Sequence, residues 1–278
     1  MRSGADRKIG SCIFLWTENV KRTIVYIDGF NLYYGLLRGT FAKWLDLVAF
    51  SKALLAPDHE IIAIKYFTSR VNYNKHEPKK KEHQEIYLRA LTHFPLIKII
   101  EGFYKSRDAK LPFRKEPCIS CRPYADVIKT EEKRSDVNLA TAMMADCHVN
   151  AADSFVVISG DADFIAPIEY IRHVAKKQVL VFNPHKAMSG HLKKIATYYK
   201  DIPRDLPAKC QLPKSFTYGT HNRQIHCPPE WLRETAELID DVRAAEEEIE
   251  RGETISQDEF KRKLIAERRL RSPQKKNG

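Results

Sequence analysis

The chain has 278 residues and a mass of 32.2 kDa, enough for one α/β domain with an appendage or for two small domains. Its hydrophobic content of 43% and aromatic content of 10% exclude global disorder, and no apolar run approaches the roughly 18–20 residues of a membrane span. The excess of 47 Lys and Arg over 36 Asp and Glu gives a net charge of +11, which favours polyanionic partners, with nucleic acid ahead of a membrane surface.

Residues 1–19 precede the first predicted strand and are expected to form a tail or an over-extended start. Their short apolar run has no small-residue cleavage site, which argues against a signal peptide. Six cysteines in a chain of this length are typical of reduced thiols and not of a secreted disulfide framework. We therefore expect a cytoplasmic protein.

Short apolar runs rich in Ile, Val and Phe alternate with segments of helical periodicity along the main part of the chain. The predicted strands are residues 23–27, 61–67, 97–103, 155–159 and 178–182. The predicted helices are residues 30–38, 47–55, 79–93, 135–147, 164–175 and 188–196. This alternation predicts a doubly wound α/β fold, in which helices cover both sides of a parallel sheet of about five strands.

Two segments interrupt the alternation. Residues 103–130 contain many Lys and Arg and a Cys-x-x-Cys pair, so they are expected to leave the sheet as an excursion, and residues 201–229 form a proline-rich strap. The predicted divisions are a tail over residues 1–19, a main domain over 20–200, the strap over 201–229, and a charged helical extension with a basic tail over 230–278. The apolar stripe of that extension makes it a candidate contact for a homodimer or a protein partner.

Acidic and amide side chains follow two of the predicted strands. Asp28 and Asn31 come after the first strand, and Asp161 and Asp163 come after the fourth. Each of them alone is also explained as a turn residue or a helix cap. If the two strands are neighbours, however, their carboxylates repel one another unless a cation lies between them, and oxygen ligands suit Mg²⁺ or Mn²⁺.

A further acidic candidate is Asp136, in the first turn of the predicted helix 135–147. The helix dipole favours a carboxylate at that position whether or not it binds a metal. Glu132, just before the helix, is expected to be an outer residue of the same site.

Three ordered motifs carry a resemblance to a known family. They are Ile24-Val-Tyr-Ile-Asp28-Gly-Phe-Asn31-Leu-Tyr-Tyr, Glu131-Glu-Lys-Arg-Ser-Asp136-Val-Asn-Leu-Ala and Val157-Ile-Ser-Gly-Asp161-Ala-Asp163-Phe. Together they resemble the NYN domain family of PIN-like nucleases over about residues 20–200, with the LabA-like (DUF88) branch as the nearest likeness. A Pro-Pro-Glu-Trp231 sequence near the end of the strap is also similar to that branch.

The resemblance implies a PIN-like (Rossmann-like) fold and a Mg²⁺-dependent ribonuclease, in which a metal-activated water hydrolyses RNA phosphodiester bonds. The implied catalytic and metal residues are Asp28, Asp136 and Asp161, with Asp163 and Asn31 in secondary roles. Ser159 and Gly160 match the turn that presents Asp161. The alternative is a non-catalytic RNA-binding or regulatory module. A phosphatase of the haloacid-dehalogenase type is disfavoured, because Phe30 stands where that chemistry needs a second aspartate.

Several further residues are candidates for binding RNA or zinc. The predicted phosphate contacts are Lys105, Arg107, Lys110, Arg114 and Arg122 in the excursion, together with Lys79–Lys81. Tyr33 and Tyr34 either stack on a base or belong to the core. Cys118 and Cys121 are either half of a Zn²⁺ site, with Cys210, His221, His226 or Cys227 as partners, or two reduced thiols. The first strand is not followed by Gly-x-Gly-x-x-Gly, and no Gly-Lys-Ser/Thr loop occurs, which disfavours dinucleotide and ATP binding.

Overall fold

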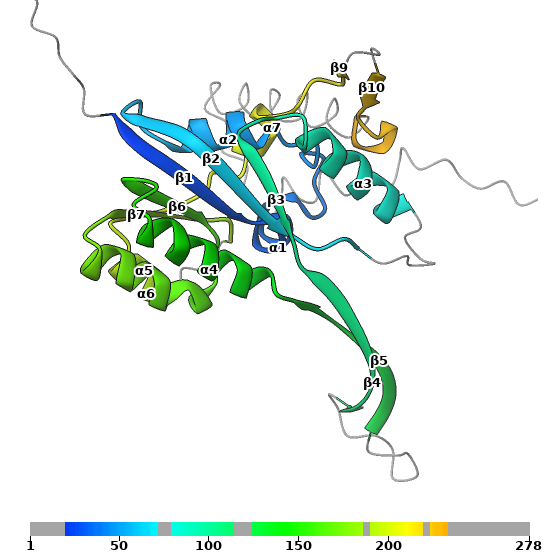
Figure 1. Cartoon of the computed structure of the whole chain (residues 1–278). Helices are drawn as coiled ribbons and strands as arrows, with labels where there is room; N and C mark the ends of the chain where they lie inside the picture. Colours follow the sequence, from blue (N-terminus) through cyan, green and yellow to red (C-terminus); the bar gives the residue numbers. More distant parts are fainter. Residues whose placement is uncertain (1–19, 72–78, 114–123, 186–189, 219–222, 233–278) are drawn as a thin grey trace, which may run out of the picture.

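A computed structural model gives the fold of the chain and describes residues 20–71, 79–113, 124–185, 190–218 and 223–232. Six parallel strands form the central sheet, in the order β3-β2-β1-β6-β7-β8 (Figure 1). The strands of this sheet are β1 (Lys21–Asp28), β2 (His59–Thr68), β3 (Ile97–Glu101), β6 (Ser154–Ile158), β7 (Gln178–Asn183) and β8 (Tyr198–Asp201). The central strands β1, β6 and β7 are almost continuously buried, because helices cover both faces of the sheet.

The helices divide between these two faces (Figure 1). One face carries α1 (Gly29–Leu32), α2 (Leu47–Leu54), α3 (Lys79–Leu91) and α7 (Leu206–Lys209), and the other carries α4 (Ser135–His148), α5 (Ile165–Glu169) and α6 (Gly190–Ile195). Each face of the sheet has its own hydrophobic core, and alternate residues of β1 pack into one or the other. Val25 and Ile27 pack on the α2–α3 side, while Ile24 and Tyr26 pack on the α4–α5 side. The sheet is therefore the middle layer of three.

The structure confirms the predicted α/β fold with helices on both sides of a parallel sheet, and the sheet has six strands in place of about five. The additional strand, β8, is a four-residue edge strand with partly exposed Tyr, Lys and Asp side chains, so it lacks the apolar run by which the others were recognised. The two predicted helices 30–38 and 164–175 each change pitch. α1 continues as a π-helical turn over Tyr33–Leu37, and α5 lies between a 3-10 turn over Ala162–Phe164 and a π-helical turn over Tyr170–Val174.

The direction of strand addition reverses at β1. The chain proceeds from β1 through β2 to β3 on one side, then returns to place β6, β7 and β8 on the other side. The carboxyl ends of β1 and β6 are consequently neighbours, with Ile27 opposite Ile158. Open α/β sheets bind their ligands at such a switch point, outside the carboxyl ends of the strands.

A two-stranded antiparallel ribbon leaves the body of the protein after β3 (Figure 1). It consists of β4 (Phe103–Pro112) and β5 (Tyr124–Lys133), paired along their whole length from Phe103 opposite Lys133 to Pro112 opposite Tyr124. The sequence predicted an excursion here but not its strands, because exposed strands of mixed polarity carry no apolar run. Residues 114–123, with Arg114, Cys118, Cys121 and Arg122, lie outside the described residues.

The strap after β8 crosses the α2–α3 face. It contains α7 and a hairpin of β9 (Ser215–Tyr218) and β10 (Arg223–His226). Trp44, only 2% exposed, donates from Nε1 to the carbonyl oxygen of Pro213 at 2.8 Å, and its ring lies 6.2 Å from that of Trp231. These contacts hold the strap on the core.

Two of the predicted divisions fall largely outside the described residues: the tail over residues 1–19, and all but residues 230–232 of the extension. In the part of the chain that the structure describes, no helix combines the length and the apolar character needed to cross a membrane.

Candidate metal centre

Four aspartates lie around the switch point between β1 and β6. Asp28 is the last residue of β1, and Asp161 and Asp163 lie in the loop and the 3-10 turn that follow β6. Asp136 is in the first turn of α4, which begins where the ribbon returns to the body. Three separate parts of the chain thus supply the acidic residues of this edge.

The carboxylate of Asp28 is buried and engaged in four hydrogen bonds. Its Oδ1 accepts from the backbone N–H groups of Phe30 at 3.1 Å and Asn31 at 3.0 Å, which makes Asp28 the amino-terminal cap of α1. Its Oδ2 accepts from Asn31 Nδ2 at 2.8 Å and Ser159 Oγ at 3.0 Å. Burial raises the pKa of Asp28, and the hydrogen bonds from Asn31 and Ser159 oppose that rise. A carboxylate has about four acceptor positions, and these four hydrogen bonds occupy them. In this arrangement Asp28 therefore holds the start of α1 and the end of β6 together.

Asn31 and Ser159 join the ends of the two strands. Asn31 Oδ1 accepts from the backbone N–H of Gly160 at 3.1 Å, while its amide nitrogen donates to Asp28. The Ser159 hydroxyl, on a residue 1% exposed, donates to Asp28 and accepts from the backbone N–H of Asp161 at 3.1 Å. The turn that carries Asp161 is therefore held against α1 by side-chain bonds.

Three of the four carboxylates, those of Asp136, Asp161 and Asp163, form a compact group. One oxygen from each residue lies within 4.8 Å of the others. The pKa of Asp136 is raised to about 6, first by burial and then by the negative charges of Asp28, Asp161, Glu132 and Asp163. These four charges all belong to carboxylates, so negative charge is concentrated around Asp136.

This donor set fits a hard divalent cation. The ligands on offer are carboxylate oxygens, which Mg²⁺ and Mn²⁺ prefer, and the group of three contains no imidazole or thiolate. A cation between the carboxylates would offset the repulsion that raises the pKa of Asp136. The structure therefore contains an aspartate group able to hold a divalent metal ion.

Glu132 fixes the start of α4 and with it the position of Asp136. Its Oε1 accepts from Ser135 Oγ at 2.7 Å, from the Ser135 N–H at 3.2 Å and from Ser69 Oγ at 2.8 Å. Because Ser69 follows β2, these bonds tie the base of the ribbon and the start of α4 to the sheet. Between Glu132 and Ser135, Arg134 has a φ of 85°, a left-handed conformation that costs a non-glycine residue about 1–2 kcal/mol.

Sequence reasoning missed one polar residue, the last residue of β7. Asn183, 1% exposed, donates from Nδ2 to Tyr199 Oη at 2.9 Å and to Asp201 Oδ1 at 3.2 Å, and its Oδ1 accepts from the His185 N–H at 2.9 Å. A Cβ atom on Gly160 would approach Asn183 Oδ1 to 2.4 Å, so this buried amide supports the turn before Asp161. The signal was available, since Asn183 ends a buried strand at the same edge as Asp28.

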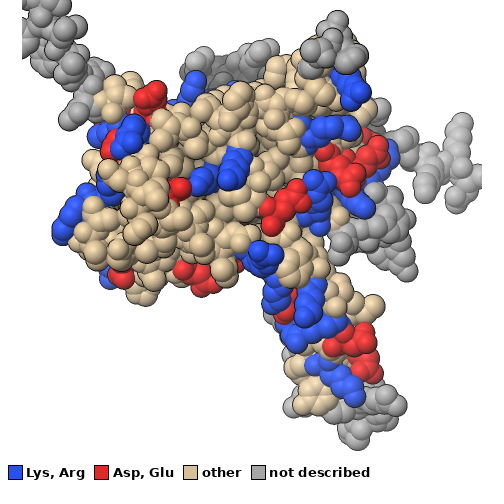
Figure 2. Space-filling model, viewed as in Figure 1, with Lys and Arg blue, Asp and Glu red and all other residues tan. Residues whose placement is uncertain are grey.

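The described part of the ribbon carries three of the predicted phosphate contacts, on two faces. Side chains alternate along a strand, so Lys105 and Arg107 lie on the ribbon face opposite Tyr104, and Lys110 shares the face of Tyr104. Glu131 forms an ion pair with Arg107 at 3.8 Å, and hydrogen bonds from two neighbouring lysines lower its pKa to about 2. Figure 2 shows acidic and basic side chains interleaved along the ribbon. Its positive charge is thus partly compensated within the ribbon.

Two of the residues considered as zinc partners of Cys118 and Cys121 lie in the core. Cys210 and Cys227 are 7% and 2% exposed and pack among apolar side chains on the α2–α3 side of the sheet. Burial raises the pKa of both thiols, that of Cys227 to about 12. Zinc binds the thiolate form, so these two residues are poor partners for such a site.

The fold and the acidic edge define a PIN-like α/β domain, in which a parallel sheet presents carboxylates at its switch point. Residues 22–203 match the NYN domain family, and the chain belongs to that family, as its three motifs predicted. It is 32% identical over 220 residues to 6-hydroxy-3-succinoylpyridine 3-monooxygenase HspA of Pseudomonas putida, across 69% of this chain and 70% of that protein.

Two solved structures resemble this one more distantly. A protein of unknown function from Vibrio parahaemolyticus has a TM-score of 0.41 and 18% identity, over 67% of this chain and 96% of that chain. MurG of Acinetobacter baumannii has a TM-score of 0.31 and 10% identity, over 69% of this chain and 43% of that chain. Both scores are below 0.5.

Proposed function

We propose that this protein is a metal-dependent ribonuclease that hydrolyses the phosphodiester bonds of RNA. The observation that carries the proposal is the group of three carboxylates, Asp136, Asp161 and Asp163, within 4.8 Å of one another at the switch point of an NYN domain. The net charge of +11 supports a polyanionic substrate, whose affinity should fall steeply with salt.

Each acidic residue has a defined part in this proposal. Asp136, Asp161 and Asp163 hold the cation, Mg²⁺ or Mn²⁺, through their oxygens. When bound, such a cation supplies positive charge beside the scissile phosphate and lowers the pKa of the attacking water. Asp28 fixes the geometry through its bonds to Asn31 and Ser159. No side-chain nucleophile is required.

The first alternative is a module that binds RNA and metal without cutting. It shares the basic surface and the carboxylate group, and it differs only in the absence of turnover. It predicts RNA binding with a steep salt dependence and no cleavage with any metal.

A second candidate activity is oxygenation of a small aromatic acid, as the name of the Pseudomonas putida relative states for that protein. The observation that favours it is a cavity lined by aromatic and lysine residues, one of which, Phe30, donates its backbone N–H to Asp28. A monooxygenase transfers one atom of O₂ to its substrate and reduces the other to water, so it consumes two electrons from a donor. Oxygen uptake in the presence of 6-hydroxy-3-succinoylpyridine and a reduced nicotinamide tests this candidate directly.

The deciding experiment is cleavage of end-labelled single-stranded RNA, structured RNA and DNA by the full chain, with Mg²⁺, Mn²⁺ or EDTA. Asp161→Asn should lower metal-dependent cleavage by at least about 100-fold. The matched control is Asp58→Asn: this aspartate lies at the opposite end of the sheet, pairs with Lys21 at 2.7 Å, and has a side chain 40% exposed. Cleavage that survives Asp161→Asn would refute the site, and RNA binding without cleavage would favour the first alternative.

A further inference from the structure

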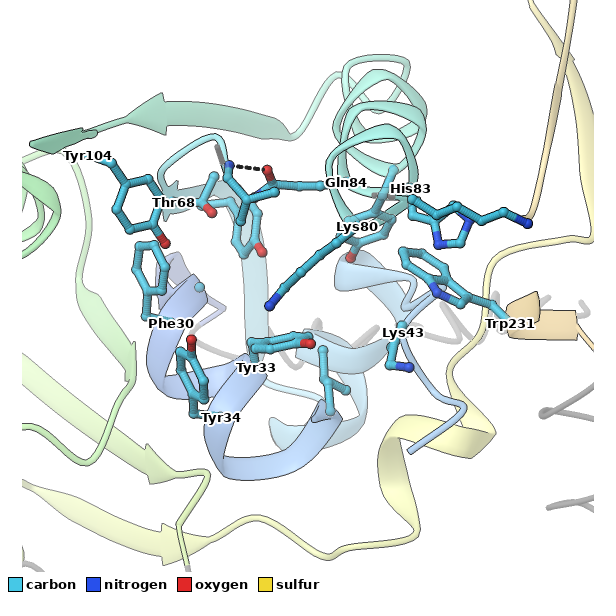
Figure 3. Close-up of a pocket in the computed structure, with 16 residues that line it drawn as sticks. Phe30, Tyr33, Tyr34, Lys43, Thr68, Lys80, His83, Gln84, Tyr104 and Trp231 are labelled. Carbon is cyan, nitrogen blue, oxygen red and sulfur yellow. Dashed lines mark hydrogen bonds between the residues drawn. The ribbon is translucent and has the colours of Figure 1, made fainter. Parts of the chain in front are cut away.

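A cavity of about 480 Å³ lies on the α1–α3 side of the sheet (Figure 3). Its walls are largely aromatic: Phe30, Tyr33 and Tyr34 come from α1 and the turn after it, and Tyr104 comes from the ribbon. Lys80 of α3 extends between these rings toward the middle of the cavity (Figure 3). The volume is within the range of about 300–1,000 Å³ that is typical of small-ligand sites.

The cavity and the metal centre share a wall. The backbone N–H of Phe30 donates to Asp28 Oδ1 at 3.1 Å, while the Phe30 ring lines the cavity and meets the Tyr104 ring edge-on at 6.0 Å between centroids. Tyr104 is also the cross-strand partner of Glu132, which holds the start of α4. The cavity therefore adjoins Asp28, one of the four aspartates around the switch point, through Phe30.

The lining combines flat rings with positive charge. Within the lining, Lys80 Nζ lies 5.9 Å from the centre of the Tyr33 ring. Arg38 is outside the lining, and its guanidinium lies 5.4 Å from the centre of the Tyr34 ring. The two tyrosine rings themselves meet edge-on at 5.3 Å. Rings of this kind stack on nucleobases, and the neighbouring cations attract phosphate.

We infer that this cavity binds one unpaired nucleobase of an RNA strand whose adjoining phosphate lies at the carboxylate group. The inference rests on the proposed function and adds its substrate class, single-stranded RNA. A base inside a duplex is stacked and paired, so it enters a cavity only after it has been flipped out. Cleavage is accordingly confined to loops, bulges and ends, where bases are already splayed.

Equilibrium binding in EDTA tests the inference independently of cleavage. The probes are a fluorescein-labelled six-nucleotide RNA and a strand of the same length with abasic riboses, which has the same phosphates and no bases. The native chain should bind the base-bearing strand about 5- to 150-fold more tightly, the contribution of one stacked base. Tyr34→Ala should remove most of this preference. Tyr170→Ala should retain it, because Tyr170 is 44% exposed, against 51% for Tyr34, and belongs to the α4–α5 side of the sheet.

Equal affinity for the two strands, or a preference that survives Tyr34→Ala, would overturn the inference. So would tight binding of benzoate, used as a probe for small aromatic acids, together with no preference for the base-bearing strand. The cleavage assay is read separately. Cleavage without base preference refutes the inference alone, whereas base preference without cleavage refutes the ribonuclease and leaves base binding established. Circular dichroism of each variant verifies that it is folded.

Discussion

The hydroxyl of Ser159 provides a quantitative test of how the metal centre is built. It donates to Asp28 Oδ2 at 3.0 Å and accepts from the backbone N–H of Asp161 at 3.1 Å, on a residue that is 1% exposed. A buried hydrogen bond to a charged carboxylate contributes about 1.5–3 kcal/mol, and a neutral one about 0.5–1.5 kcal/mol. Ser159→Ala should therefore lower the free energy of unfolding by roughly 2–4 kcal/mol.

A matched control lies in β6, the strand that Ser159 directly follows. Ser154 is 0% exposed on β6, and its hydroxyl has no hydrogen-bond partner within the described ranges. Ser154→Ala removes a buried group that makes no bond, so it should be neutral or stabilising by up to about 1 kcal/mol. Both variants delete a buried serine hydroxyl, one at the start of β6 and one directly after its end, and the two hydroxyls differ in the bonds that they make.

The measurement is urea-induced unfolding at pH 7 in EDTA, followed by circular dichroism. EDTA keeps divalent cations away, so the difference in midpoint reports the bonds of the chain itself. The midpoint should fall for Ser159→Ala with little change in the urea dependence of the free energy of unfolding. If the two alanine variants differ by less than about 0.5 kcal/mol, the network around Asp28 does not stabilise the fold in the way described.

Two further substitutions test the turns around the site. Gly160→Ala should destabilise the fold by about 1–3 kcal/mol, because the new Cβ would lie 2.4 Å from the buried amide oxygen of Asn183. It should also lower any metal-dependent cleavage. If unfolding and activity are both unchanged, the amide of Asn183 can move to make room. Arg134→Gly should raise the free energy of unfolding by up to about 1 kcal/mol, since glycine adopts the observed φ of 85° without strain. Arg134→Ala keeps the strain and serves as the comparison, and equal midpoints for the two variants would contradict the interpretation.

The acidic residues could be predicted because each follows a strand or begins a helix that the sequence marks clearly. Asp28 and Asp161 stand directly beyond buried apolar runs, and in a parallel sheet the ends of such runs lie at one edge. The same rule applied to the strand before Asn183 would have found that residue also. What the local pattern cannot give is the hydrogen bonding of a carboxylate, so the four bonds that engage Asp28 appear only in the structure.

The aromatic cavity could not be predicted from the sequence, for a different reason. Tyr33 and Tyr34 were recognised as candidates for stacking, but Tyr104 and Trp231 reach the same space from the ribbon and the strap. Their sequence positions are separated from α1 by about 70 and 200 residues, and no spacing rule connects them. Residues brought together by tertiary contacts alone carry no periodic signal.

The ribbon is joined to the carboxylate group both by the backbone between β5 and α4 and by the side chain of Glu132. Gly102 alone separates the end of β3 from the start of β4. A Cβ on this glycine would lie 2.4 Å from Glu132 Oε1. The same oxygen accepts from Ser135 in the first turn of α4, one residue before Asp136. One carboxylate oxygen of Glu132 thus contacts the junction before the ribbon, the loop after β2 and the first turn of α4. The position of Asp136 in the metal centre and the direction in which the ribbon leaves the body are consequently set by the same side chain.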